Sequence, residues 1–145
     1  MFAAMAALGL ALPAAAADLI AKPSPHSVAD TAARFVAAVE GAGAKVFAQV
    51  DHAAGAASID AELRPTVMIL FGNPNIGTPV MQADQAAGID LPLRMLVWED
   101  AEGQVSIGYL PPTELAARYD VPEDLKALQM MAGALDKLTS AAVAE

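Results

Sequence analysis

The side chain best suited to chemistry is His52, which directly follows Asp51. A histidine titrates near neutral pH, so it can serve as a general base or bind a ligand. It can equally have a structural role, in which the ring bonds its own loop. The other histidine, His26, lies between Pro25 and a predicted helix start and is the weaker candidate.

A second group of candidates follows an apolar run that ends at Phe71. Gly72 permits backbone conformations that other residues resist, and Pro74 holds Asn73 in an extended shape. The Asn73 amide can then bond either a ligand or the backbone of its own loop. This stretch is where a small domain would place a binding surface.

The next segment, Gly77-Thr-Pro79, has the features of a helix start. Thr78 is the predicted N-cap and Pro79 the first helical residue. The free N–H groups at such a start can hold an anion, although a plain N-cap needs no ligand. We therefore predict one ligand-binding surface made by Asp51, His52, Phe71, Gly72, Asn73, Pro74, Gly77 and Thr78.

Two other kinds of site can be assembled from the same residues. An enzyme would use His52 as its acid or base, with Asp51 or Asn73 beside it. A metal or haem carrier would use His52 with Met81 as its ligands. The chain has no cysteine, so it lacks the Cys-x-x-Cys-His motif that attaches haem, and we predict no cofactor.

Helices and strands alternate along the chain in the predicted structure. Apolar spacing and turn residues predict helices over residues 28–40, 79–87, 111–119 and 122–142, and strands over residues 18–21, 45–50, 66–71, 93–98 and 104–109. Residues 51–57 fit either a loop or one helical turn. The run at 66–71 lacks alternation, which is typical of a central strand covered on both faces.

The strands at 93–98 and 104–109 follow each other directly and predict a hairpin, so the sheet is at least partly antiparallel. Trp98 and Tyr109 lie on these adjacent strands and are core residues, cross-strand partners or the floor of a pocket. Helices on one face of such a sheet make an α+β, two-layer domain.

Composition narrows the classes of partner. Asp and Glu outnumber Lys and Arg by 17 to 8, and the formal charge is -9. This charge repels nucleic acid and anionic lipid surfaces, and the basic residues are scattered rather than clustered. Without cysteine no disulfide can form, so the apolar core must hold the fold by itself.

The first 17 residues contain no charged side chain and are mostly Ala, Leu and Met. Their apolar core is too short to span a bilayer, which needs about 20 residues. Small residues precede Asp18, as in a signal-peptide cleavage site. We therefore predict a signal peptide over residues 1–17, one domain over residues 18–145, and no stable membrane span after the signal is removed.

Several short motifs carry a resemblance to a known family. They occur in one order: Ser24-Pro-His-Ser27, Val50-Asp-His52, Leu63-Arg-Pro-Thr66, Phe71-Gly-Asn-Pro74, Gly77-Thr-Pro79, Met81, Asp90-Leu-Pro92, Val97-Trp-Glu-Asp100 and Tyr109. Together they resemble the domain-of-unknown-function family DUF 302 over nearly all of residues 18–143. The resemblance implies a curved, mainly antiparallel sheet with helices on one face, of the TATA-binding-protein-like type. It implies no activity, because fold is not function.

These observations predict a secreted or periplasmic, non-catalytic protein that binds a small molecule or a protein partner. The second hypothesis is an enzyme that uses His52 as its acid or base, and the third is a metal or haem carrier that uses His52 and Met81. A homodimer is also expected, because a small sheet has edges to cover.

Overall fold

The computed structural model describes residues 18–145, and the predicted signal peptide lies outside this part of the chain. The elements follow in the order β1 (Ile20–Ser24), α1 (Val28–Gly41), β2 (Lys45–Asp51), α2 (His52–Ala57), β3 (Thr66–Gly72), α3 (Pro74–Ala83), the 3-10 helix η1 (Gln85–Ile89), β4 (Leu93–Glu99), β5 (Val105–Tyr109), α4 (Thr113–Arg118) and α5 (Lys126–Val143).

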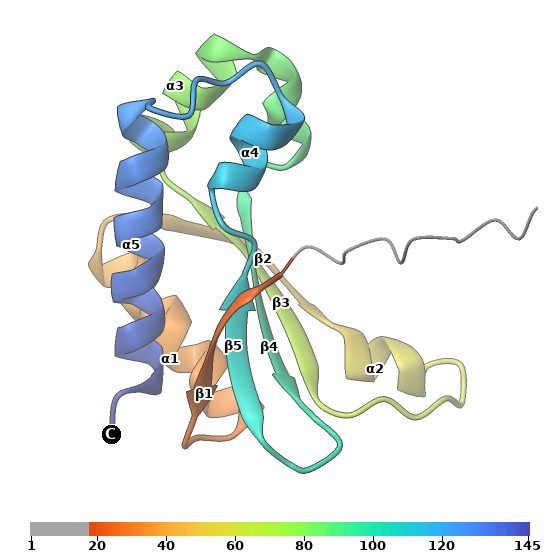
Figure 1. Cartoon of the computed structure of the whole chain (residues 1–145). Helices are drawn as coiled ribbons and strands as arrows, with labels where there is room; N and C mark the ends of the chain where they lie inside the picture. The colour runs from red at the N-terminus through yellow and green to blue at the C-terminus, as the bar shows by residue number, and fades with distance from the viewer. Residues whose placement is uncertain (1–17) are drawn as a thin grey trace, which may run out of the picture.

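The five strands form one antiparallel sheet in the order β1-β5-β4-β3-β2. Helices α1 and α5 contact each other and lie on one face of this sheet (Figure 1). The predicted α+β domain with an antiparallel sheet and helices on one side is therefore confirmed. Its core lies between the two layers and includes Phe35 of α1, Ile69 of β3, Ile107 of β5 and Leu135 of α5.

The first helix begins where the sequence predicts. The Ser27 hydroxyl oxygen accepts a hydrogen bond from the Asp30 backbone N–H at 3.0 Å, which caps α1. Strand β1, by contrast, covers Ile20–Ser24 rather than residues 18–21. It continues through Pro23 because β1 is an edge strand, where a missing N–H removes no ladder bond.

The prediction that a helix starts at Thr78 is wrong. Helix α3 begins at Pro74, and Asn73 is its N-cap. The Asn73 side-chain oxygen accepts a hydrogen bond from the Asn75 N–H at 2.9 Å, so this amide bonds its own backbone. Asn followed by Pro is itself a helix-start signal. Thr78 therefore lies inside the helix and offers no terminal N–H groups to an anion.

The prediction that β3 is covered on both faces is wrong for the single chain. Ile69 and Phe71 are buried beneath the helices, whereas Met68 and Leu70 are half-buried on the opposite face. Figure 1 shows α1 and α5 on one side of the sheet only. We call the other side, to which Met68 and Leu70 point, the open face.

Trp98 and Tyr109 lie on opposite faces of the sheet, so they are not cross-strand partners. Tyr109 is buried in the core. The Trp98 ring lies on the open face, since its atoms are 3.2 Å from the position that a Cβ on Gly108 would occupy. The hairpin that joins their strands turns at Gly103, whose φ of +82° favours glycine.

The ambiguous segment after β2 is helical. Asp51 caps α2 by accepting a hydrogen bond from the Ala54 N–H at 2.9 Å. None of the residues of α2 is buried. Figure 1 shows this helix and the loop behind it projecting from the sheet on the side away from α1 and α5, and we call this projection the α2 arm (residues 52–65).

Candidate ligand-binding cavity

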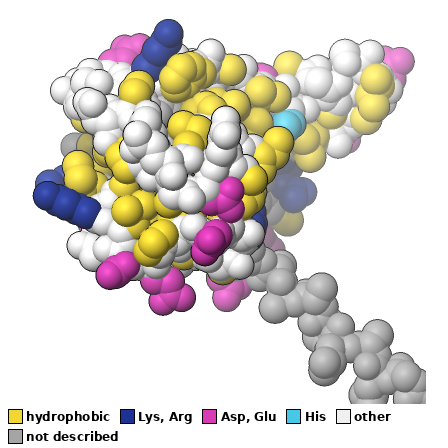
Figure 2. Space-filling model, turned by 90° about the horizontal axis from the view of Figure 1, so that it is seen from above, with side chains coloured by type: hydrophobic (Ala, Val, Ile, Leu, Met, Phe, Trp, Pro, Cys, Tyr) yellow, Lys and Arg dark blue, Asp and Glu magenta, His cyan; other side chains and the backbone are white. Residues whose placement is uncertain are grey.

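A cavity of about 240 Å³ lies where α3 and α5 meet the ends of strands β2, β3 and β4. Hydrophobic side chains reach the surface at the end of the molecule that carries α3 and α4 (Figure 2). The cavity is lined by Ala44, Phe47, Phe71, Gly72, Asn73, Pro74, Ile76, Gly77, Thr78, Met81, Leu91, Pro92, Leu93, Met131, Ala134, Leu135 and Leu138.

Phe47 forms the outer wall of the cavity because β2 contains a β-bulge. Its neighbours Val46 and Ala48 pair with consecutive residues of β3, which leaves Phe47 without a partner in the ladder. An unpaired residue bends its strand and redirects its side chain. The ring lies beside Gly72, where a Cβ would be 3.8 Å from the ring edge and 3.5 Å from Pro92. Phe47 is 52% exposed, so it also faces solvent.

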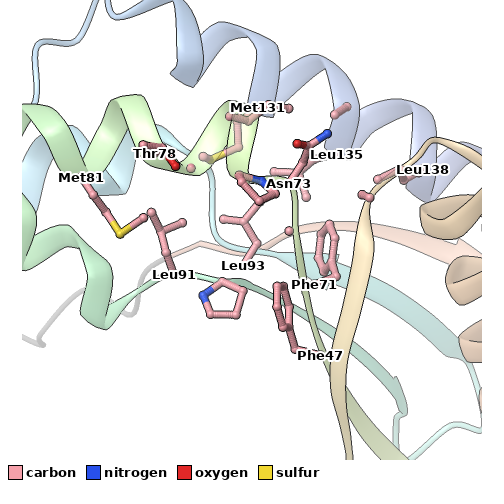
Figure 3. A pocket seen from close by; sticks show the side chains of 17 residues that line it. Phe47, Phe71, Asn73, Thr78, Met81, Leu91, Leu93, Met131, Leu135 and Leu138 are labelled. Atoms are coloured by element: carbon pink, nitrogen blue, oxygen red, sulfur yellow. The ribbon is translucent and has the colours of Figure 1, made fainter.

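Phe71 makes the floor of the cavity. Its ring meets that of Phe35 edge to face, with the ring centroids 4.9 Å apart, which fixes it in the core. Figure 3 shows the Phe47 and Phe71 rings on one side of the cavity and Leu91 with Met81 on another. Leu135 of α5 is buried and lines the cavity from the helix layer.

Polar groups are few in the cavity lining. They come from Asn73 and Thr78, on the loop before α3 and on α3 itself. The Asn73 oxygen is engaged as the helix cap, which leaves its amide N–H groups as donors. No residue of the lining carries a charge or an ionisable acid or base. The cavity therefore offers neutral hydrogen-bonding groups in an apolar space.

The structure does not bring Asp51 and His52 to this cavity. Asp51 pairs with Val67 at the start of β3, whereas Gly72 stands at its end. Five residues of a strand separate the two positions by about 17 Å. His52 is exposed at the first turn of α2. The predicted surface thus divides: Phe71, Gly72, Asn73, Pro74, Gly77 and Thr78 line the cavity, while Asp51 and His52 lie at the opposite end of the sheet.

The predicted pair of His52 and Met81 is separated in the same way. Met81 lines the cavity, and its sulfur lies 3.3 Å from the position that a Cβ on Gly88 would take. Glycine at residue 88 therefore leaves room for this thioether. Within residues 18–145 there is no group of three or more His, Cys, Asp or Glu side chains that could hold a metal ion.

A second cavity, of about 460 Å³, lies at the place where β5 leaves β4. The pairing of these strands starts at Leu96 and Gly108, although β4 begins at Leu93. Residues of α4 and of the segment after β5 close the gap. Leu93 and Leu135 line both cavities, so they form the wall between them.

Asp90 anchors the loop between the two cavities. Its carboxylate accepts hydrogen bonds from the Tyr119 hydroxyl at 2.8 Å, from Arg118 at 3.2 Å and from Arg94. These donors, Tyr119 first, hold the pKa of Asp90 below its ordinary value of 3.8 despite partial burial. The same bond to Asp90 raises the pKa of the Tyr119 hydroxyl.

Several residues of the lining are not among those predicted from the sequence. Met131, Leu135 and Leu138 lie in the helix predicted over residues 122–142, whose apolar spacing indicates burial but not which element the helix contacts. Phe47 carries no local signal, because a bulge leaves the apolar pattern of a strand unchanged. The apolar pair Leu91 and Leu93 around Pro92 is a signal that could have identified this loop.

Comparison with known proteins identifies the family to which the chain belongs. A family described as "Domain of unknown function DUF302" matches residues 20–138. The chain belongs to the DUF302 family. A solved structure, an uncharacterized conserved DUF302 protein from Bacillus stearothermophilus, aligns with a TM-score of 0.68 and 20% identity over 86% of this chain and 94% of that chain. At this identity the likeness concerns the fold alone.

Curated relatives occur in Brucella. A protein of Brucella suis named fluoride-specific ion channel FluC 1 is 44% identical over 103 residues, which are 71% of this DUF302 chain and 41% of the relative. A protein of the same name from Brucella abortus is also 44% identical, over 38% of its length. The chain thus spans about two fifths of these relatives. Among residues 18–145 no helix is both long and apolar enough to cross a membrane.

Proposed function

We propose that this DUF302 domain is a non-catalytic binding protein for a small, uncharged, mainly apolar molecule. The observation that carries the proposal is the cavity of about 240 Å³ with an apolar lining and the neutral groups of Asn73 and Thr78. Small-molecule sites are commonly apolar hollows with a few placed polar groups. A cavity of roughly 150 Å³ takes benzene, so this one suits a ligand of roughly ten non-hydrogen atoms.

The lining also indicates the charge of the ligand. A carboxylate or ammonium group would lose its hydration on entry and meet no opposite charge among the lining residues. A carbonyl, ether or hydroxyl oxygen can instead accept a hydrogen bond from the Asn73 amide or the Thr78 hydroxyl. We therefore expect one neutral oxygen on an apolar body.

No observation favours the enzyme that would use His52. The cavity contains no ionisable side chain, and His52 lies about 17 Å along the strand from Gly72. General acid–base catalysis needs a titratable group within hydrogen-bond reach of the substrate. No observation favours the metal or haem carrier either, because the side chains of His52 and Met81 lie near different ends of β3 and do not come together.

A panel of ligands with one phenyl body tests the proposal. Ethylbenzene, 2-phenylethanol, phenylacetate and phenethylammonium differ in the group at the end of a short chain. We expect 2-phenylethanol to bind best, ethylbenzene next, and the two ions least, because each ion must be desolvated without a partner. Titrations followed by amide chemical shifts would give the order and show whether residues 71–78 respond.

A matched pair of variants separates cavity binding from surface binding. Ala134→Phe places a ring in the cavity from α5, whereas Ala132→Phe adds the same ring at an exposed position of that helix. Binding should be lost in A134F and kept in A132F. If A134F binds as well as the unchanged protein, or if no neutral ligand binds at millimolar concentration, the proposal fails.

We also propose that the domain works in the periplasm or outside the cell, on the strength of the apolar, uncharged residues 1–17. Expression of the full chain in a Gram-negative host, followed by fractionation and N-terminal sequencing, tests this. A mature protein that starts at Asp18 in the periplasm is expected. An unprocessed chain retained in the cytoplasm would contradict it.

A second candidate, an accessory role beside an ion channel, is favoured by the names of the Brucella relatives, two fifths of which this chain matches. Deletion of the gene should then lower the tolerance of cells to fluoride, and a plasmid copy should restore it. Unchanged tolerance in the deletion strain would set this candidate aside.

A further inference from the structure

The open face of the sheet is unusually apolar for a surface that no helix covers. Met68 and Leu70 of β3 and Leu96 and Trp98 of β4 are half-buried there, and Val50 at the edge is 38% exposed. An antiparallel sheet with one solvated face normally alternates apolar and polar residues. The sequence accordingly predicts β3 to be covered on both faces, while the single chain covers only one.

The strands contribute no acidic side chain to the open face, although Asp90 lies beside it in an ion pair with Arg94. Strand residues that point to it include Lys45 and Arg94 near one end but no Asp or Glu, although the chain as a whole has a formal charge of -9. Two copies of an acidic protein repel each other least where they meet without carboxylates. The apolar centre of the face can also pack against its own copy, since a two-fold axis brings the same surface of both chains together.

The size of the surface can be compared with what a dimer requires. Five strands about 4.8 Å apart, with five to seven residues of about 3.3 Å each, present a flat area of roughly 500 Å². A stable pair buries about 800 Å² on each partner. The α2 arm projects on the same side of the sheet (Figure 1) and carries Ile59, 76% exposed, and Leu63, 50% exposed. The arm can supply the missing area.

We propose that two copies of this chain stack their open faces against each other, with each α2 arm covering the partner. The contact buries Trp98, Met68 and Leu96 and gives β3 its second apolar layer. The contact leaves aside the first cavity, whose lining lies mainly on the helix side of the sheet, but it includes Met68 and Leu96, which line the second cavity.

Trp98 provides the direct measurement, because it is the only tryptophan of the chain and its ring lies on the open face. The full chain, purified after any natural processing, should have the mass of a dimer by sedimentation velocity at micromolar concentration. Dilution should dissociate the dimer and expose Trp98 to solvent. The fluorescence emission of Trp98 should then shift to longer wavelength, and acrylamide should quench it more strongly.

Three variants that each add one carboxylate decide which surface is used. Val50→Glu and Ala21→Glu lie on the open face, on the opposite edge strands β2 and β1, and both sites are exposed, so folding should survive. Gln49→Glu is the control, because it adds the same group to the neighbouring residue of β2 on the other face. We expect V50E and A21E to weaken dimerisation at least about tenfold and Q49E to leave it unchanged.

Other outcomes would overturn the proposal. A monomer at every concentration, with Trp98 always open to acrylamide, would mean that no second copy covers the face. Loss of the dimer in both V50E and Q49E, but not in A21E, would mean that the β2 edge is the contact. Circular dichroism on all variants establishes that each retains the fold.

Discussion

At the scale of the residue, side chains here gain their roles from where the backbone places them rather than from their chemical type. His52 is the most reactive side chain by type, yet it stands exposed on α2, away from the cavity. Phe47 has no special chemistry, yet the bulge turns it into a cavity wall. Asp90 is one of many carboxylates by type, and its three donors make it the anchor of the loop between the cavities.

The replacement Asp90→Asn tests this anchor through its pH dependence. The folded protein holds the pKa of Asp90 below 3.8, so the ionised carboxylate contributes stability above that pH and loses it as the pH falls through the lower folded value. D90N should lower the free energy of unfolding by about 1 kcal/mol near neutral pH, a modest cost because the arginine partners are partly exposed.

Urea unfolding followed from about pH 6 to about pH 2 would show the sign, since the difference between D90N and the unchanged protein should shrink towards the acid end. Asp100→Asn in the β4–β5 turn is a control, because this half-buried turn carboxylate accepts hydrogen bonds from backbone N–H groups and lines neither cavity. A difference that grows on acidification would contradict the anchor.

At the scale of the element, α3 is the part that the sequence placed least well. Both Asn73-Pro74 and Thr78-Pro79 have the form of a cap followed by proline, and the helix that packs on α5 uses the first of them. A proline inside a helix removes one hydrogen bond, and helix α3 tolerates Pro79 in its middle. Sequence rules give these two helix-start signals equal weight, whereas the folded chain uses the one that places α3 in the helix layer.

Removal of the α3 cap should disturb both the helix and the cavity. Asn73→Ala leaves the Asn75 N–H without its acceptor, and the loss of an N-cap costs about 1 kcal/mol. Asn73→Ser keeps a capping oxygen and should retain most of the stability. Thermal unfolding checks the order, and equal losses in N73A and N73S would show that the cap contributes little.

At the scale of the whole molecule, the sequence was sufficient for the two layers and for the β4–β5 hairpin, but not for the other strand pairings or for the site as a whole. Apolar periodicity places the residues of α1 and α5 on the core, because burial alone determines that pattern. The separation of His52 from Gly72 follows from the antiparallel pairing of β2 with β3, which local spacing does not reveal. The open face is visible only when the helices are seen to occupy one side.

Net charge gives a prediction for the assembled molecule. Two chains of formal charge -9 repel each other, and salt screens this repulsion. The proposed dimer should therefore tighten as the sodium chloride concentration rises from about 0.02 M to about 0.5 M, as measured by sedimentation equilibrium. Weaker association in salt would indicate an interface dominated by ion pairs, such as those of Lys45 or Arg94 with the exposed Asp60 or Glu62 of the α2 arm, rather than by apolar contact.

The bulge in β2 also bears on how this domain tolerates changes in length. Since Phe47 has no partner in the ladder, its deletion leaves the pairs on either side of it intact and turns an irregular strand into a regular one. A one-residue deletion elsewhere in the strand would reverse the faces of every residue beyond it. Loss or gain of one residue at this position can therefore remove or restore the outer wall of the cavity while the strand pairing of the sheet stays the same.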